Sequence, residues 1–302
     1  MIRILWVLWG CADDAKEVRE SCPPSPWASV EVGYWAACGV HEDGCAVCWG
    51  DGVEDDTYYG RTFDILAVPG DRRYAEITMA PSEACGVPEF ACGITLDGEV
   101  VCWGQRYEVN NPTVAMSLPA VDLAVGECIV CAIDTAGALV CSGHNQEDFP
   151  EGAFSEVEVG VQGPEWDSYP WCGVDLSGEV QCWGEYLPPT LLGPGPFETI
   201  SMASSICGIR GTGELECNWV RGSVLGGDER FVAVSAGGDG DCALTTEGEV
   251  RCFHAGSTPT TDGVPSGTFK SLSSGYRSAC AVSTDGELVC WGADFNGLLD
   301  HP

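Results

Sequence analysis

Basic residues are scarce in this chain. Its 302 residues include 13 Lys and Arg against 46 Asp and Glu, which gives a formal net charge of −33. Nucleic-acid binding needs a basic footprint that neutralises phosphates, so we expect no nucleic-acid partner. A basic partner or bound cations suit this charge, although acidity alone also serves to keep a protein soluble.

Long apolar runs are also missing, and no stretch is long enough to cross a membrane as a helix. The chain starts MIRILWVLWGC, with Arg3 before a short apolar run, and LWGC resembles a bacterial lipoprotein cleavage site. This predicts a short lipoprotein-type signal peptide over residues 1–10, lipidation of Cys11 and a polar tether over residues 11–26. The alternative is the hydrophobic terminus of a cytosolic protein.

Motifs for catalysis and metal binding are absent as well. The sequence has no HExxH, no Gly-x-Ser-x-Gly, no phosphate-binding loop and no dinucleotide fingerprint. Four His and two CxxC pairs could suggest zinc, but both pairs overlap the regular cysteine pattern described next. We therefore expect no catalytic residue, no metal ligand and no cofactor.

Cysteine, in contrast, is abundant. Nineteen Cys are too many for a reduced cytosolic protein without a metal role, which predicts an exported protein with disulfides. Seven times, nine residues separate two Cys and a Gly stands at the same offset between them, as in CGITLDGEVVCWG (92–104). The pairs are Cys38 with Cys48, Cys92 with Cys102, Cys131 with Cys141, Cys172 with Cys182, Cys207 with Cys217, Cys242 with Cys252, and Cys280 with Cys290.

This spacing predicts a hairpin joined by its own disulfide. Leu96, Asp97 and Gly98 form a three-residue turn in which Gly98 takes the left-handed conformation. Cys92 then lies opposite Cys102, with Cα atoms about 4.5–5.5 Å apart. Each disulfide closes a short loop and should contribute about 2–3 kcal/mol to stability.

A second strand-like element precedes each hairpin and follows the pattern aromatic-x-x-aliphatic, as in Phe154-Ser-Glu-Val157. Repeats of about 40 residues with three to four strands each are typical of propeller blades. The sequence thus predicts an all-β, seven-bladed β-propeller over residues 27–302, with no separate domain and in monomeric form.

The last repeat also carries a family resemblance. Its segments FKSLSSG (269–275), CAVSTDG (280–286), CWG (290–292) and ADFNGL (293–298) resemble the repeat of the regulator of chromosome condensation family. The resemblance implies a seven-bladed propeller. The nuclear member is a nucleotide-exchange factor for a small GTPase, whereas the cysteines and acidity here resemble secreted bacterial members. No exchange-catalysing residue can be placed, and fold alone does not imply function.

Five cysteines remain outside the hairpins. If Cys11 is lipidated, four are left, and their places in the blades predict the pairs Cys22–Cys45 and Cys85–Cys128.

Two irregular loops are candidate partner-binding sites, because rigid folds carry function on loops. Residues 50–60 contain Tyr58 and Tyr59, and residues 160–171 contain Trp166, Tyr169 and Trp171. Exposed aromatic residues often anchor interfaces. The alternative is that these rings fold back and cap the propeller.

The sequence favours a non-enzymatic binding propeller, surface-anchored through lipid or secreted, whose partner is a protein or a cell-envelope component. A propeller-type polysaccharide lyase or hydrolase that uses acidic residues at the central channel is the first alternative. A regulator that resembles a guanine-nucleotide exchange factor is the second.

Overall fold

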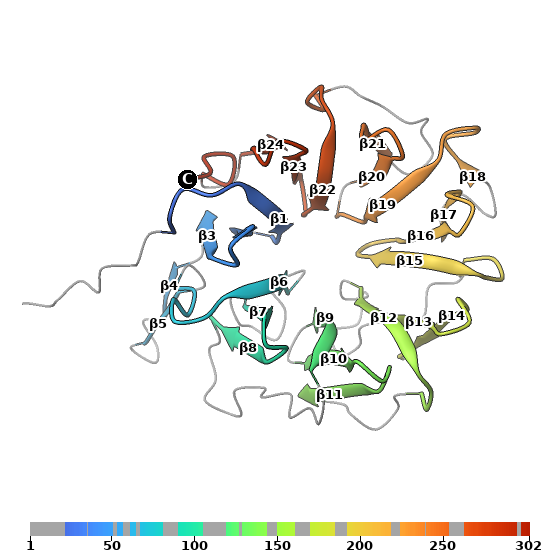
Figure 1. Cartoon of the computed structure of the whole chain (residues 1–302), viewed down its shortest axis with the longest axis horizontal. Helices are drawn as coiled ribbons and strands as arrows, with labels where there is room; N and C mark the ends of the chain where they lie inside the picture. Colours follow the sequence, from blue (N-terminus) through green and yellow to red (C-terminus); the bar gives the residue numbers. More distant parts are fainter. Residues whose placement is uncertain are drawn as a thin grey trace, which may run out of the picture.

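The computed structural model describes residues 22–34, 36–50, 53–56, 61–64, 67–80, 90–104, 119–126, 129–143, 150–160, 170–184, 192–218, 224–238, 240–253, 263–294 and 297–302. The strands form seven antiparallel sheets arranged as blades around a central axis (Figure 1). The predicted all-β, seven-bladed β-propeller is therefore confirmed. A separate two-stranded sheet pairs β4 (Val53–Asp56) with β5 (Arg61–Asp64).

Each blade begins with the strand nearest the axis. Six of these inner strands start at an aromatic residue, and the third starts at Ala120. They are β1 (Trp27–Val32), β6 (Tyr74–Met79), β9 (Ala120–Gly126), β12 (Phe154–Val159), β15 (Phe197–Met202), β19 (Phe231–Ser235) and β22 (Phe269–Ser274).

The next two strands of each blade form the cysteine hairpin. The middle strand carries the first Cys and the outer strand the second. The fifth blade adds a fourth strand, β18 (Val224–Leu225). In chain order the hairpins are β2 (Ala36–His41) with β3 (Ala46–Gly50), β7 (Ala91–Thr95) with β8 (Val100–Trp103), β10 (Ile129–Asp134) with β11 (Leu139–Gly143), β13 (Trp171–Asp175) with β14 (Val180–Trp183), β16 (Ile206–Arg210) with β17 (Leu215–Cys217), β20 (Asp241–Thr245) with β21 (Val250–Phe253), and β23 (Ser278–Ser283) with β24 (Leu288–Gly292).

The β7–β8 hairpin has the predicted register. Cys92 pairs with Cys102, and the Thr95 amide donates to the Glu99 carbonyl over 2.8 Å. Gly98 has a φ of 80°. All seven hairpin disulfides form, with Cα atoms 3.9–4.1 Å apart. This is closer than expected, because the cysteines occupy the non-hydrogen-bonded kind of pair, in which opposed residues approach most nearly.

Every inner strand contains a β-bulge directly after its first residue. In β12, Phe154 opposes Asp175 and Glu156 opposes Val174, so Ser155 is the extra residue. A bulge reverses the alternation of side chains along a strand. This explains why the aromatic residue shares a face with a residue three positions later, not two. It also explains two exposed valines, Val121 and Val232, which are the extra residues of β9 and β19.

The ring closes through a hydrogen bond that all seven blade junctions share. The first amide of each inner strand donates to the turn Gly of the preceding blade, over 2.8–2.9 Å. At the closure, the Trp27 amide donates to the Gly286 carbonyl over 2.9 Å. The C-terminal segment adds a contact, since the Trp49 Nε1 donates to the Leu298 carbonyl over 2.9 Å. The seventh blade has three strands within the described residues.

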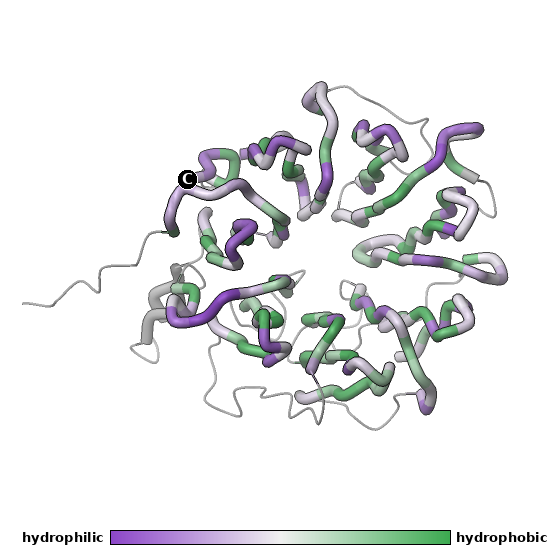
Figure 2. Tube along the Cα trace, viewed as in Figure 1, coloured by the Kyte–Doolittle hydropathy of each residue, from purple (hydrophilic) through white to green (hydrophobic). Residues whose placement is uncertain are grey.

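The core lies within and between the blades, where apolar stretches appear green in Figure 2. The aromatic residue of an inner strand packs on the ring that follows the second Cys. Tyr74 and Trp103 have ring centroids 5.6 Å apart, and Phe231 and Phe253 have centroids 6.0 Å apart. Phe253 therefore fills the position that Trp occupies in other repeats.

One further disulfide attaches the N-terminal segment to the first blade. Cys22 and Cys45 are bonded, with Cα atoms 5.7 Å apart. Cys45 follows the turn Gly44, so residue 22 is held at the end of the propeller where the hairpin turns lie. The predicted signal peptide, Cys11 and the Cys85–Cys128 pair lie outside the described residues.

Candidate functional site: an acidic central channel

The third and fifth residues of the inner strands are mostly polar. In the first four blades these positions hold five acids, and in the last three they hold mainly hydroxyl groups. Because the bulge separates these positions from the apolar face, they turn towards the axis and the neighbouring blade. The acids are Glu31, Glu76, Asp122, Glu156 and Glu158.

All five acids line a cavity of about 440 Å³ on the propeller axis. The other lining residues are apolar, Gly, Ser, Thr and Tyr. Among the described residues that line this channel, there is no Lys, Arg or His. The channel is therefore a concave, acidic site without a basic side chain among the described lining residues.

Three of the acids connect adjacent blades, namely Asp122, Glu156 and Glu31. Asp122 Oδ2 accepts the Val157 amide over 2.7 Å. Glu156 accepts from the Thr199 hydroxyl over 2.7 Å and, through Oε2, from the Ile200 amide over 2.9 Å. These bonds link the third, fourth and fifth blades at the axis.

Glu31 lies at the junction of the seventh and first blades. The Ser273 hydroxyl donates to Glu31 Oε2 over 3.0 Å and accepts the Val32 amide over 2.9 Å. Glu76 and Glu158, by contrast, accept no hydrogen bond within the described part of the chain. Both are partly accessible to the channel.

Burial raises the pKa of every acid in the channel. The pKa is about 7 for Glu31, where the Ser273 hydrogen bond opposes burial, and about 6 for Asp122, where two backbone amides oppose it. It is about 8 for Glu76, where burial and then the charges of Asp122, Glu31 and Glu156 raise it.

The pKa of Glu156 is also about 8, because burial outweighs the lowering by its Thr199 hydrogen bond. Burial and then repulsion from the other four acids raise the pKa of Glu158 well above its ordinary range. Without a counter-ion, the channel is therefore partly protonated near neutral pH.

One end of the channel opens between the loops that join inner and middle strands. Tyr34 and Tyr276, from the β1–β2 and β22–β23 loops, stack with ring centroids 4.7 Å apart and line the cavity. The Arg277 guanidinium carbon lies 5.2 Å from the centre of the Tyr276 ring. A Cβ at Gly238 would lie 2.3 Å from Tyr276 Cδ2, so the β19–β20 loop needs glycine there. We call this end the tyrosine mouth.

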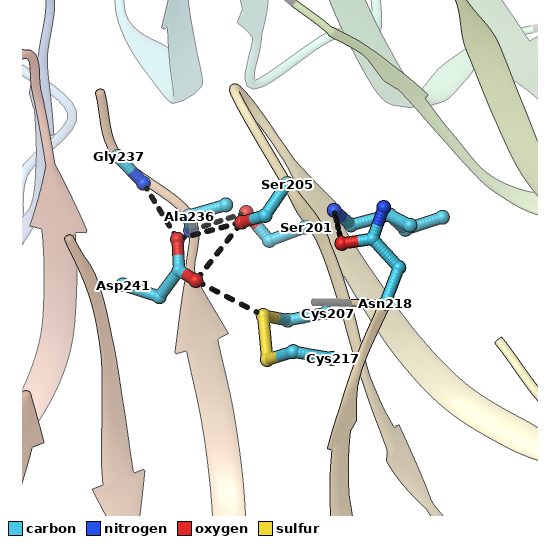
Figure 3. Close-up of a disulfide and its surroundings, with 9 residues drawn as sticks. Ser201, Ser205, Cys207, Cys217, Asn218, Ala236, Gly237 and Asp241 are labelled. Carbon is cyan, nitrogen blue, oxygen red and sulfur yellow. Dashed lines mark hydrogen bonds between the residues drawn. A yellow bond between two sulfur atoms is a disulfide. The ribbon is translucent and has the colours of Figure 1, made fainter. Parts of the chain in front are cut away.

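A buried acid near the same end belongs to the structure of the blades. Asp241 points towards the Cys207–Cys217 disulfide and accepts from the Ser205 hydroxyl over 2.8 Å (Figure 3). Asp241 and the two sulfurs form a group close enough for a metal, but both sulfurs are bonded to each other. The group therefore offers one ligand only and is no metal site.

Of the predicted partner-binding residues, the structure describes Trp171. This side chain is 5% exposed in β13 and belongs to the core with Phe154 and Val159. The prediction of an exposed anchor is wrong for Trp171, because it starts the middle strand, whose side chains pack between blades. Trp166, Tyr169, Tyr58 and Tyr59 lie outside the described residues.

Sequence reasoning placed acidic residues at the channel only within the enzyme alternative and named none of them. The signal is present in the repeats, since Glu76, Asp122 and Glu156 each stand two positions after the start of an inner strand. This signal can be recognised only when the bulge is known, because the bulge turns that position away from the aromatic core.

Comparisons with known proteins agree with this fold. The profile of the regulator of chromosome condensation (RCC1) repeat matches residues 269–298, which confirms the resemblance read in the last repeat. The CRINKLY WD40 ectodomain of the receptor kinase ACR4 from Arabidopsis thaliana is 20% identical, with a TM-score of 0.62 over 90% of this chain and 96% of that chain.

The entire ectodomain of the receptor kinase CR4 from Physcomitrella patens is also 20% identical, with a TM-score of 0.64 over 89% of this chain and 75% of that chain. At this identity the likeness shows the propeller fold alone. Within the described residues, no helix is long and apolar enough to span a bilayer.

Proposed function

We propose that this RCC1-like β-propeller is an exported, non-enzymatic module that binds a protein at its tyrosine mouth. The observation that carries the proposal is the acidic channel, which opens beside the stacked rings of Tyr34 and Tyr276. Tyrosines beside a concave pocket are common anchors of interfaces. Propellers present such loops on a rigid ring, which suits a binding module.

The disulfides support export. Eight are present in the described part of the chain, seven in hairpins and one at Cys22–Cys45. Such bonds persist in oxidising compartments and are rare in the cytosol. Cell fractionation with palmitate labelling tests the anchored form: label in the envelope fraction, lost in Cys11→Ala, is expected. A reduced, cytosolic protein would contradict export and revive the exchange-factor alternative.

The Cys22–Cys45 disulfide orients an anchored propeller. It holds residue 22 at the end of the hairpin turns, opposite the tyrosine mouth. Ten residues separate Cys11 from Cys22, so the eleven Cα-to-Cα steps between them reach about 40 Å at most. A lipid on Cys11 would therefore keep the hairpin turns near the membrane and point the mouth outwards.

The charge favours a basic partner, either a protein or a basic component of the cell envelope. The chain carries a formal net charge of −33, and five of its acids line the channel, where no described lining residue is basic. Complementary charge accelerates association and excludes acidic partners. Binding should consequently weaken as ionic strength rises.

Photo-crosslinking tests which face binds. A crosslinking residue replaces Tyr276 at the mouth or, as the control, Leu176, which is 68% exposed at a hairpin turn of the opposite end. In producing cells, we expect adducts from position 276 and none from 176. Equal adducts from both positions, or adducts from 176 alone, would contradict the assignment of the face.

A polysaccharide lyase or hydrolase is the second candidate, because carboxyls with pKa values of about 6–8 suit general acid catalysis. A screen of acidic and neutral glycans tests it. We expect no turnover by the wild type. Turnover that disappears in Glu156→Gln would establish the enzyme and contradict the binding module.

A further inference from the structure

The channel contains more carboxyl groups than its own hydrogen bonds satisfy. Asp122, Glu156 and Glu31 accept bonds from neighbouring blades, but Glu76 and Glu158 accept none from the residues described. Enclosed carboxylates are costly unless they are paired. Either protons or a cation from outside must therefore neutralise these two groups.

Ser274 provides an observation independent of the acids. Ser274 lines the cavity next to the tyrosine mouth and is 9% exposed, and its enclosed hydroxyl has no hydrogen-bond partner among the described residues. The equivalent positions of the other six blades are apolar: Val32, Met79, Val125, Val159, Met202 and Ala236. A buried hydroxyl without a partner is uncommon, and here it marks a polar residue at an otherwise apolar position beside the channel.

The geometry argues against a single metal ion. Within the described residues, no three channel carboxyls bring their oxygens within 4.8 Å of one another. A metal ion needs several oxygens in one tight shell. A lumen of about 440 Å³ instead has room for an organic cation with a flexible chain.

We propose that the channel binds an alkylammonium cation on a flexible chain, which is either a free polyamine or a lysine side chain of a partner protein. The lysine source rests on the proposed function, and the polyamine source does not depend on it.

Each part of the site matches a part of this ligand. An ammonium group has three donors, and the carboxyls of Glu158 and Glu76 offer acceptors that no described residue uses. The stacked rings of Tyr34 and Tyr276 offer an apolar surface to an alkyl chain at the mouth. Glu156, Asp122 and Glu31 line the same cavity and act electrostatically on Glu158, so they add attraction for the cation.

Calorimetric titration of the disulfide-intact chain with spermidine tests the proposal. We use low ionic strength and about pH 8, where the channel acids are more fully ionised. Saturable binding is expected, weakened by more than about tenfold in Glu158→Gln and in Glu76→Gln. Glu151→Gln is the matched control, since Glu151 is exposed and outside the channel, and it should bind like the wild type.

Two results would overturn the proposal. One is the absence of spermidine binding, or an affinity that is equal in the channel variants and in Glu151→Gln. Equal affinity would mean that spermidine is attracted generally to an acidic surface. The other is stoichiometric calcium binding that is lost in Glu158→Gln while no amine binds, which would make the channel a metal site. Glutamine has the size of glutamate and removes a repulsive charge, so we expect both channel variants to fold. Thermal melting checks this.

A second titrant separates the two sources. A pentapeptide with one central lysine and blocked ends carries the same ammonium group as spermidine but only one such group. Peptide binding that depends on Glu158 supports the lysine source, and spermidine binding without peptide binding supports the polyamine. If spermidine binds and crosslinking at Tyr276 finds no protein, the cation site stands and the protein-binding function fails.

Discussion

At the scale of single residues, the hairpin turns depend on glycine. Gly98 has a φ of 80°, and a Cβ there would lie 2.3 Å from Pro119 Cβ in the next blade. The same residue also accepts the Ala120 amide through its carbonyl, over 2.9 Å. One residue therefore closes the turn and joins two blades.

Gly98→Ala should lower the free energy of unfolding by about 1–3 kcal/mol, from the left-handed conformation and the contact with Pro119. Gly70→Ala is the control, because nothing lies within 4 Å of a Cβ there, and it should change stability by less than about 0.5 kcal/mol. Guanidinium denaturation with intact disulfides measures both. Equal losses of unfolding free energy in the two variants would show that the left-handed conformation of the turn does not determine stability.

Glu158 should make stability depend on pH. Its pKa is raised in the folded state, so the folded chain binds more protons than the unfolded chain above about pH 4.5. The stability that Glu158 contributes is therefore fully present below about pH 4.5 and is lost as the pH rises towards the folded pKa. Glu158→Gln should match the wild type near pH 4 and exceed its stability near pH 8.

The measurement is the guanidinium midpoint of wild type, Glu158→Gln and Glu151→Gln at both pH values. Glu151→Gln should follow the wild type, since that side chain is exposed. A wild type that is more stable at pH 8 than at pH 4, with no gain in Glu158→Gln, would contradict a buried, repelled carboxyl.

At the scale of elements, the disulfide-bonded hairpin is the repeated unit. Cys92 is fully buried, and its bond with Cys102 closes a short loop across β7 and β8. Replacing both residues with alanine should lower the free energy of unfolding by about 2–3 kcal/mol. Alanine avoids burying an unpaired hydroxyl. A loss below about 0.5 kcal/mol, measured by denaturation against the oxidised wild type, would assign hairpin stability to packing alone.

Sequence reasoning works best for these elements because they are local. The turn Gly98, the Thr95–Glu99 pair and the Cys92–Cys102 register all follow from spacing within thirteen residues. It fails where a residue's surroundings come from other blades. Trp171 looks like a loop aromatic in sequence, yet it starts β13 and is buried by neighbouring strands.

The bulge explains why the channel was not predicted in detail. A regular alternation would place Glu156 on the same face as Phe154, within the core. The extra residue Ser155 reverses that face and turns Glu156 to the axis. The convergence of acids from four blades is a property of the closed ring, which no single repeat encodes.

At the scale of the whole molecule, the ring depends on the junction of the last and first blades. There the Ser273 hydroxyl accepts the Val32 amide and donates to Glu31. Ser273→Ala leaves both groups without this partner and should cost about 1–3 kcal/mol. Hydrogen exchange of the Val32 amide should also accelerate.

Ser271→Ala is the control in the same strand, because Ser271 pairs with Val282 through its backbone and its hydroxyl makes no hydrogen bond among the described residues. It should leave the exchange of Val32 unchanged. Similar exchange rates at Val32 in Ser273→Ala and the wild type would show that another contact holds the ring closed.

The same ring creates the site, since the channel exists only when all seven blades are assembled. Its acids differ from surface acids in one measurable respect. Surface carboxyls, with ordinary pKa values of about 4, are already ionised at pH 7, whereas Glu76 and Glu156 have pKa values of about 8 and hold protons there. A cation that enters the channel must displace those protons.

Proton release on spermidine binding is therefore the most direct test of the acidic channel as the functional site. It is measured by calorimetry at pH 7 in two buffers with different ionisation enthalpies. We predict release of about one proton or more per bound spermidine, and less release in Glu158→Gln. Binding without proton release would place the cation on the outer surface and contradict the account.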